Sequence, residues 1–421
     1  MTGCQSTSDA SGDRGLPAAR AIEALRARPS PITTVERVPV RAALGRVLAQ
    51  DLVSPIDVPA FDNSAMDGYA FDGACLDAGV RGLRLRGVAF AGRPFTEAVE
   101  HGECVQVMTG AVMPRGCDTV VPRESCRVDA GMMTFEAGIR RGENRRLRGE
   151  DLRAGSVAIP AGRILRPAEL GLAASLGFGE LGVWRRLRVA FFSTGDELRS
   201  IGEPLAPGEV YDSNRYTLLG MITRLGMDAI DLGVVRDEPA ALEQALRSAA
   251  ESADVVITSG GVSAGDADYV RDVMAGIGDV EFWRIAMRPG RPMAYGHVRS
   301  TSGRSATLFG LPGNPVAVMV TFYQFVREAL LHLQRANPDP LPIFKVRCLD
   351  ALRKRPGRTE YLRGILGTDE AGQAVVRSFR TQGSGVLRSM SEGNCFIVLG
   401  HDEGSVEIGG LVSVLPFAGL A

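Results

Sequence analysis

The chain has 421 residues, of which 45% are apolar and 23% are charged, so it is too long for one ordinary core and has the composition of a globular protein. Its 48 basic residues nearly balance its 49 acidic residues, which excludes a global attraction to nucleic acid or to an anionic membrane. We therefore expect two to four domains, and any anion-binding site must be local.

The sequence shows no targeting pattern and no cysteine or histidine pattern for a metal site. The N-terminal segment is small and polar, without the apolar run of a signal peptide or lipoprotein anchor. The longest apolar stretches, such as 316–320, are far shorter than the roughly 20 residues of a membrane span, so we expect a soluble, cytoplasmic protein. Seven cysteines without a C-x-x-C pair are interpreted as core thiols, and four scattered histidines show no zinc-ligand spacing.

The chain up to about residue 186 combines helical stretches with short β-like runs. The apolar residues of 17–52 follow a broadly helical spacing, and 168–177 is a second helical stretch that we expect to pack with the first. Between them, a glycine-rich region contains the runs CVQVM (104–108) and DTVVP (118–122), which are typical of strands. This pattern predicts a helical N-terminal element with a small β-rich module.

From about residue 187 the pattern changes to apolar strands that alternate with amphipathic helices. Strands are predicted at 188–193, 229–235, 254–260 and 306–313, and helices at about 213–225, 239–252, 268–276 and 315–333. Such alternation predicts a doubly wound parallel sheet. A proline-rich linker (337–342) follows, and five short strands separated by glycine-rich turns then predict a small β-barrel or sandwich.

The predicted fold class is therefore multidomain α/β plus β, with helical and β-rich N-terminal domains, a doubly wound α/β domain and a C-terminal β-barrel. The predicted parts of the chain are a disordered tail (1–16), domain I (17–61 and 149–186), the inserted β-rich domain II (62–148), the α/β domain III (187–337) and the β-barrel domain IV (338–421).

Carboxylates follow the predicted strands of domain III. Asp196 and Glu197 come after the first strand, Asp237 after the second, and Asp268 in the loop after the third. Because ligands of open parallel sheets bind beyond the carboxyl ends of the strands, we expect these side chains to share one edge of the sheet. For any one of the three aspartates, helix capping is the alternative interpretation.

A glycine turn made of Ser259, Gly260, Gly261 and Ser263 follows the third predicted strand. Glycines let backbone N–H groups approach a ligand, and a helix N-terminus favours an anion, so we interpret the turn as a phosphate cradle. A tight strand-to-helix turn without a ligand is the alternative. The segment matches neither a P-loop nor the dinucleotide-binding G-x-G-x-x-G pattern. Glycines also occur after the fourth strand, in GLPGNP (310–315), and this convergence favours a functional edge.

Charged residues near this edge suggest which ligands it takes. Carboxylates beside a phosphate cradle repel the substrate unless a cation lies between them, so the cluster predicts a magnesium-type ion. Arg284, Arg288 and Arg291 follow in WRIAMRPGRP (283–292). The prolines and glycine of this segment favour a shaped loop that holds guanidinium groups toward an oxyanion, with a solvated charged stripe as the alternative.

Eight motifs resemble the bacterial MoeA proteins and the E domain of gephyrin, from about Arg20 onward. They are SPIDVPAFDNSAMDGYA (54–70), VMTGA (107–111), GENRRLRGEDL (142–152), FSTGDEL (192–198), GEVYDSN (208–214), VVITSGGVSAGDADYV (255–270), LPGNPVAV (311–318) and GNCFIVL (393–399). Motifs of this length and spacing are too specific to match by coincidence.

The resemblance implies an elongated four-domain homodimer, with the molybdopterin-binding domain III of one chain facing domains I and II of its partner. The residues that it implies on the partner side are Asp67, Thr109, Arg146 and Asp151. Those that it implies on the sheet side are Glu197, Asp237, Asp268, Pro292, Pro312 and Pro315, and in the last domain Arg363 and Ser384. Catalytic roles fall on Asp67, Asp151, Glu197, Asp237 and Asp268, of which the last three are the expected Mg²⁺ ligands.

The implied reaction inserts molybdenum from molybdate into adenylyl-molybdopterin and releases AMP with the molybdenum cofactor, in the presence of Mg²⁺. Molybdate is a tetrahedral dianion that needs fixed cationic donors, and a phosphoanhydride needs a metal held by carboxylates. The implied partners are a second copy of the chain, with other cofactor-synthesis proteins and molybdoenzymes as further candidates, but neither nucleic acid nor a membrane.

Two other functions fit parts of the sequence. A molybdopterin adenylyltransferase resembles only residues 187–337, and the three additional domains count against it. A non-catalytic scaffold like gephyrin at synapses is disfavoured by the complete carboxylate set.

This chain departs from the family at three positions. Members of the family commonly carry lysines where this chain has Arg284, Arg288 and Arg291. Arginine keeps the positive charge but alters the geometry of the hydrogen-bond donors. Molybdate and tungstate share charge and shape, so the residues do not distinguish them.

Overall fold

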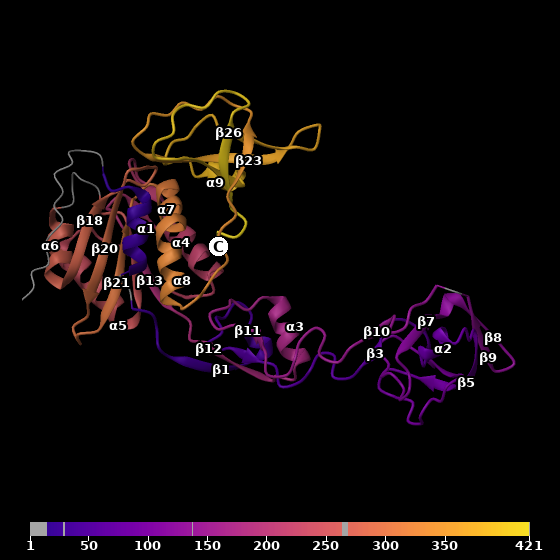
Figure 1. Ribbon diagram of the computed structural model, residues 1–421. Helices are drawn as coiled ribbons and strands as arrows, with labels where there is room; N and C mark the ends of the chain where they lie inside the picture. Colours follow the sequence, from indigo (N-terminus) through magenta and orange to yellow (C-terminus); the bar gives the residue numbers. More distant parts are fainter. Residues whose placement is uncertain (1–14, 28–29, 137, 263–267, 421) are drawn as a thin grey trace, which may run out of the picture.

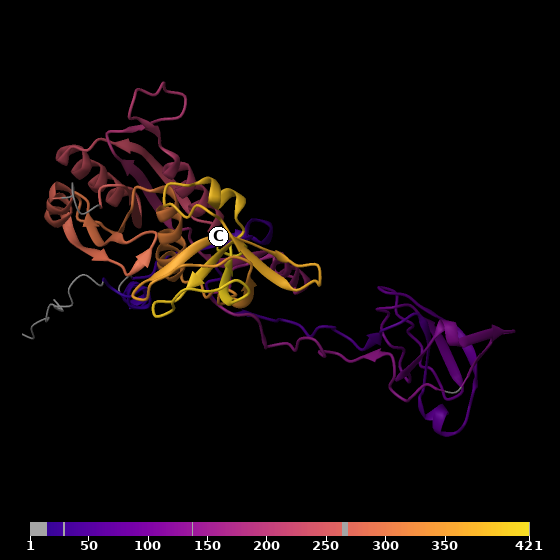
Figure 2. The ribbon, with the colours of Figure 1, turned by 90° about the horizontal axis from the view of Figure 1, so that it is seen from above.

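The computed structural model describes residues 15–27, 30–136, 138–262 and 268–420. Domain III carries the barrel of domain IV on one side, and domain I leads away from it to domain II at the far end of a two-stranded arm (Figure 1). The same elongated arrangement is seen from above (Figure 2). The predicted multidomain α/β plus β fold class is confirmed.

Domain III is built on a six-stranded sheet in the order β16-β13-β17-β21-β20-β18. Its elements are β13 (Arg188–Thr194), β14 (Leu198–Arg199), β15 (Val210–Tyr211), α4 (Ser213–Arg224), β16 (Asp228–Val235), α5 (Pro239–Ser252), β17 (Val255–Ser259), α6 (Asp268–Ile277), β18 (Gly278–Arg284), β20 (Pro292–Arg299), β21 (Ser305–Leu311), α7 (Pro315–Thr321), η3 (Phe322–Val326) and α8 (Arg327–Leu333). The four predicted strands are confirmed and run parallel. Buried side chains cover both faces of the sheet, which explains why these strands are apolar throughout.

Two antiparallel strands that were not predicted from the sequence extend the sheet beyond β21. β18 pairs with β20, and β20 pairs with β21, in antiparallel register. The basic segment 284–291 connects β18 to β20 and turns the chain back along the sheet. Within it, the short strand β19 (Met287–Arg288) leaves this sheet and pairs with domain IV. The basic segment therefore lies at the boundary between the two domains.

The helical run Pro315–Leu333 is a core helix of domain III. By length and composition it could cross a membrane, and it is the one such helix among the described residues, but 72% of it is buried inside the protein. Its π-helical part, η3, packs against α1 (Ala18–Ala27). The apolar character of the run therefore reflects its central position in the core shared by α1, the sheet and the barrel.

Domain I consists of short antiparallel ribbons covered by α3. Its elements after α1 are β1 (Val35–Pro39), η1 (Val40–Ala42), β2 (Leu52–Val53), β11 (Val157–Ile159), α3 (Pro167–Ser175) and β12 (Glu180–Trp184). The helical prediction is confirmed for α1 and α3 but is wrong for 35–39, where β1 pairs with the distant β12. The two helices also pack apart from each other: α1 lies against α8, whereas α3 lies against η1.

Domain II is a six-stranded sheet in the order β7-β4-β6-β5-β9-β8, which confirms the predicted β-rich module. Its elements are β4 (Gly68–Phe71), α2 (Ala74–Asp77), β5 (Gly82–Ala89), β6 (Glu103–Val107), β7 (Thr119–Pro122), η2 (Arg123–Ser125), β8 (Cys126–Asp129) and β9 (Met132–Phe135), and the arm adds the pair β3 (Asn63–Ser64) and β10 (Arg145–Arg146). Cys75 and Cys104 are fully buried, and burial raises the pKa of Cys104 to about 12. These two cysteines are core thiols, as the sequence predicts.

Domain IV is a barrel of five strands, all of which are predicted from the sequence. Its elements are β22 (Phe344–Cys348), β23 (Thr359–Thr368), β24 (Ala374–Ser378), α9 (Arg388–Glu392), β25 (Cys395–Leu399) and β26 (Leu411–Pro416). Pairing of β23 with β25 closes the barrel. Tyr361 and Phe396 lie in the core of domain III, so the barrel is joined to the sheet domain by apolar packing.

A polar joint fixes the point where domain I enters domain III. The guanidinium of Arg185 donates two hydrogen bonds of 2.7 Å to the carboxylate of Asp254. The same carboxylate accepts a bond of 2.9 Å from the backbone N–H of Arg188. Burial raises the pKa of Asp254, but these hydrogen bonds outweigh it and leave the pKa below its ordinary value. Gln334 adds a further link by donating to the carbonyl of Arg185 at 2.6 Å.

We predict that Asp254→Asn destabilises the protein by about 1–3 kcal/mol, because it weakens charge-assisted bonds at a largely buried position. The measurement is the midpoint of urea unfolding. Asp228→Asn is the matched control, since Asp228 is exposed and begins β16, the strand that pairs with β13. Equal midpoints for the two variants would contradict the structural role of this joint.

Candidate functional site

The carboxyl ends of β13 and β16 bring together carboxylates that are far apart in the sequence. Oδ1 of Asp237, which follows β16, accepts a hydrogen bond from Oγ1 of Thr194 at the end of β13. The backbone N–H of Asp237 lies 3.4 Å from Oδ1 of Asp196. Glu197 is exposed in the same loop, and its carboxylate lies against Gly195, where an added Cβ would be 2.7 Å from Oε2. The predicted residues Glu197 and Asp237 thus share one edge, together with Asp196.

The glycine turn after β17 passes very close to the end of β13. Gly260 and Gly261 have φ values of 96° and 69°, and an added Cβ at Gly260 would overlap the carbonyl oxygen of Thr194. The N–H of Gly260 donates to the carbonyl of Leu311 at 3.1 Å, which ties the turn to the end of β21. Ser263 and the side chain of Asp268, the first residue of α6, lie outside the described residues.

A buried polar network connects the chain segments at this edge of the sheet. Nδ2 of Asn214 donates to Oγ of Ser259 at 2.8 Å and to the carbonyl of Gly313 at 2.6 Å. Oγ of Ser259 in turn lies 3.4 Å from the carbonyl oxygen of Pro312. Asp212 caps α4 by accepting from the N–H of Arg215 at 3.2 Å, and it accepts from Oγ of Ser193 at 3.0 Å.

Asp212 and Asn214 were not predicted as site residues. Both are nearly inaccessible to solvent, with 2% and 7% exposure. The signal for them was present in the motif GEVYDSN (208–214), because polar residues at a helix start within a specific motif indicate a positioning role. They hold the ends of β13, β17 and β21 in register beneath the predicted cradle.

A second cluster lies at the boundary between domains III and IV. Arg363 of β23 is completely buried, and its guanidinium donates to Oγ of Ser389 at 3.0 Å and to the carbonyl of Gly383 at 2.9 Å. Nη1 of Arg363 is buried without a hydrogen-bond partner. Burial, and then the nearby charge of Arg288, lower the pKa of Arg363 to about 10. A buried cation with a free donor next to a second cation favours an anionic ligand.

The remaining predicted residues of this region surround the boundary. Ser384 accepts a hydrogen bond of 3.0 Å through its carbonyl from the N–H of Val316, in the first turn of α7. Pro315 is the first residue of that helix. Arg284 ends β18 opposite Pro292, which begins β20, and Arg291 precedes it. Arg288 is close enough to Arg363 for its charge to lower the pKa of that side chain.

The predicted residues of the arm and domain II form a separate group. Oδ1 of Asp67 accepts hydrogen bonds of 2.7 Å from both the N–H and Oγ1 of Thr109, and these bonds lower the pKa of Asp67. Arg146 lies in β10 and Asp151 in the following loop, both exposed. In both views this part of the chain is remote from domain III (Figures 1 and 2). One chain therefore does not bring the two groups together.

This multidomain protein has carboxylates and a glycine turn at the end of a doubly wound sheet, and a buried guanidinium at the boundary with the next domain. Ligands of open α/β sheets bind at such an edge. The sequence matches the MoeA N-terminal region (domain I and II) over residues 16–177, a probable molybdopterin binding domain over 190–332 and the MoeA C-terminal region (domain IV) over 345–417.

Relatives are similar over nearly the whole chain. A molybdopterin molybdenumtransferase of Haemophilus influenzae is 40% identical, over 91% of this chain and 94% of its own length. One of Nostoc is 36% identical, over 90% of this chain and 88% of its own. The crystal structure of a molybdopterin biosynthesis MoeA protein from Pyrococcus horikoshii superposes with a TM-score of 0.81 at 27% identity, covering 96% of this chain and all of that one. The chain belongs to the MoeA family of transferases in molybdenum cofactor biosynthesis.

We predict that Thr109→Ala raises the pKa of Asp67 toward its ordinary value of 3.8 without reaching it. The variant loses the hydroxyl bond, whereas the backbone N–H bond, which lowers the pKa most, remains. The pKa is measured by NMR from the carboxyl carbon of Asp67 during an acid titration. Thr134→Ala in the same domain is the control and leaves the pKa unchanged. A fully restored pKa in Thr109→Ala would show that the backbone bond is lost as well.

Proposed function

We propose that the protein inserts molybdenum from molybdate into adenylyl-molybdopterin and releases AMP with the molybdenum cofactor. The observation that carries the proposal is the buried guanidinium of Arg363, with its unpaired Nη1, beside Arg288. A buried guanidinium with an unpaired donor and a second guanidinium nearby match a tetrahedral dianion such as molybdate, whereas a neutral ligand would leave the buried charge of Arg363 uncompensated. Tungstate, with equal charge and shape, would bind the same donors.

The carboxylates at the sheet edge would act on the phosphoanhydride of the substrate. The described residues hold no group of three or more side chains that could bind a metal ion by themselves. Mg²⁺, however, is usually bound by one or two carboxylates together with substrate phosphates, and Asp196 and Asp237 fit that smaller donor set. When bound, Mg²⁺ would neutralise the charge that develops as the anhydride breaks.

The other site residues take roles that follow from their positions. Glu197 and Asp268 would complete the carboxylate group, and the turn at Gly260 and Gly261 would admit the phosphates close to the backbone. The wall between the cradle and Arg363 would be shaped by Arg284, Arg291, Ser259, Pro292, Pro312, Pro315 and Ser384.

We predict that AMP release requires both molybdate and a divalent cation. Without a cation the carboxylates of Asp196, Glu197 and Asp237 repel the anionic substrate, so EDTA abolishes release and added Mg²⁺ restores it. The assay follows AMP by chromatography after incubation with adenylyl-molybdopterin. Omission of molybdate serves as the control for non-productive hydrolysis. Full turnover in metal-free buffer would remove Mg²⁺ from the mechanism.

We also propose that each active site is built from two chains of a homodimer. The sheet edge of one chain would supply Glu197, Asp237 and Asp268, and the partner would supply Asp67, Thr109, Arg146 and Asp151. The support is that domain II and strand β10, which carries Arg146, lie at a distance from domain III of the same chain (Figure 1), and that Asp67, Arg146 and Asp151 are exposed. A two-fold dimer makes two equivalent sites of this kind.

Mixed dimers test this arrangement. Asp67→Ala and Asp237→Ala are each expected to be nearly inactive alone, because each lacks one half of every site. After co-expression, random pairing makes about half of the dimers mixed, and each mixed dimer has one intact site of two, so activity returns to roughly a quarter of wild type. The assay is AMP release by the purified mixture. A mixture as inactive as its components would place both residues in a site within one chain.

A further inference from the structure

A second concave site lies in domain IV. An open cavity of about 530 Å³ lies between the loop after β22 and the loop before β26. Leu352 and Val406 lie across from each other in these loops and exchange two backbone hydrogen bonds of 2.8 Å. Leu352 belongs to the barrel core and Val406 packs against it, so the cavity is at one end of the barrel. Ligand sites in barrels commonly lie at such an end.

This cavity is distinct from the cluster around Arg363, although β23 contributes to both. Glu360 lines the cavity, and the next residue but one, Leu362, packs against the barrel core. Tyr361 belongs to the core shared with domain III. Because successive side chains of a strand point to opposite faces, Arg363 lies on the face of β23 that is turned away from the cavity.

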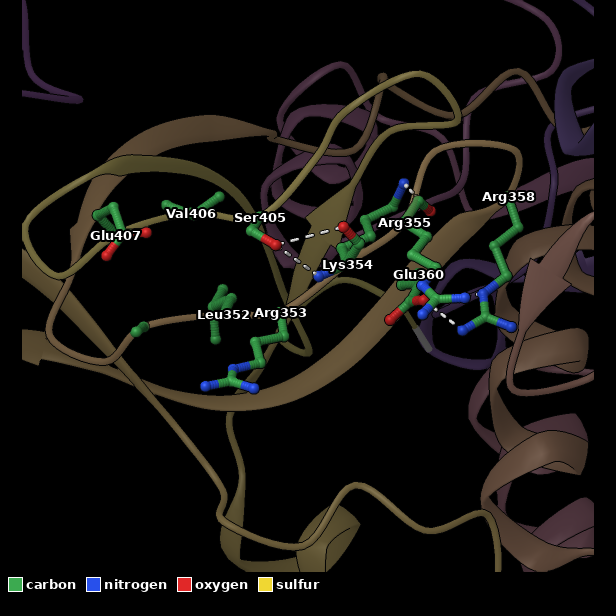
Figure 3. A pocket seen from close by; sticks show the side chains of 10 residues that line it. Leu352, Arg353, Lys354, Arg355, Arg358, Glu360, Ser405, Val406 and Glu407 are labelled. Atoms are coloured by element: carbon green, nitrogen blue, oxygen red, sulfur yellow. Dashed lines mark hydrogen bonds and ion pairs between the residues drawn. The ribbon is translucent and has the colours of Figure 1, made fainter.

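The lining of the cavity is strongly basic. Figure 3 shows Arg353 next to Leu352, and Arg355 and Arg358 together near Glu360. Arg358 forms an ion pair of 2.8 Å with Glu360. Within the described part of the chain, the side chains of Arg353 and Arg355 have neither an ion pair nor a hydrogen bond. The cations that line the cavity outnumber its carboxylates; they are Arg353, Lys354, Arg355 and Arg358 against Glu360 and Glu407.

Lys354 adds a fixed positive charge beneath the cavity. Its side chain is buried, with 6% exposure for the residue, and Nζ donates to the carbonyl of Glu403 at 2.7 Å. The carbonyls of Arg355 and His401 lie 3.4 Å from the same nitrogen. No carboxylate among the described residues pairs with this ammonium group. A buried ammonium group held only by carbonyl dipoles leaves a net positive field in the cavity above it.

We propose that this cavity binds a small molecule that carries a phosphate group. Arg353 and Arg355 would supply guanidinium groups, which bind phosphate oxygens bidentately. Binding would break no ion pair or hydrogen bond that these two side chains form within the described part of the chain. The apolar wall of Leu352 and Val406 would contact the organic part of the ligand. A volume of about 530 Å³ is within the range of pockets for molecules of this size.

Methyl NMR of the full-length protein tests the proposal at the site itself. The methyl groups of Leu352 and Val406 report on the cavity, and they are assigned through Leu352→Ile and Val406→Ile. AMP and inorganic phosphate are titrated separately, with adenosine as the uncharged comparison. We expect the methyl signals to shift with AMP, with inorganic phosphate or with both, and to stay in place with adenosine. A shift with phosphate alone or with AMP alone identifies which part of the ligand is required.

Paired variants decide whether the arginines cause the binding. The double variant Arg353→Gln and Arg355→Gln should weaken binding by about tenfold or more, since two charge-assisted contacts are lost. Arg377→Gln, an exposed arginine of the same domain, should bind as the wild type does. Three results would each overturn the proposal: no methyl shift with either anion, an equal shift with adenosine, or unchanged affinity in the double variant. The last would place the bound anion at another site.

Discussion

The buried guanidinium of Arg363 is the constraint around which the functional end of the molecule is organised. It holds the segment at Gly383 and Ser389 in place, and Ser384 of that segment accepts the hydrogen bond from the first turn of α7. Arg363 thereby orders, within the barrel, the segment that contacts the sheet domain, while one of its own donors is unpaired. A buried cation costs free energy unless its donors are satisfied, so the group that orders this contact also favours an oxyanion at the domain boundary.

Close backbone approach produces the other half of the site. Gly260 brings the turn after β17 against the end of β13, and Asn214 holds the chain after β21 beside it. At the same edge the carboxylate of Asp196 lies next to the backbone N–H of Asp237, although the two residues are far apart in sequence. Domain II, at the end of its arm, cannot contribute to this edge in the same chain (Figure 1). The separation of Asp67 from Asp237 is the physical reason for proposing a site that two chains share.

The predictions from sequence succeeded where local pattern decides the outcome. Continuous apolar strands, capped helices and glycine turns located the parallel sheet, and the loop carboxylates followed from its topology. Prediction failed where strand pairing is non-local. Residues 35–39 form a strand because they pair with the distant strand β12, and the antiparallel strands β18 and β20 were not predicted. The proximity of Arg288 and Arg363 likewise depends on β19 joining the barrel, which no spacing in the sequence indicates.

The distribution of lysine and arginine can be understood from the geometry of their donors. The chain has only two lysines, and one of them, Lys354, is buried where its ammonium group faces three carbonyl oxygens. A compact group with three donors fits that position, and a planar fork would not. In the segment 284–291 the family resemblance leads one to expect lysines, yet arginines are present. An oxyanion accepts hydrogen bonds from either side chain, so the exchange of lysine for arginine at an anion site preserves the charge. At Lys354 the same exchange would disrupt the loop that borders the barrel cavity.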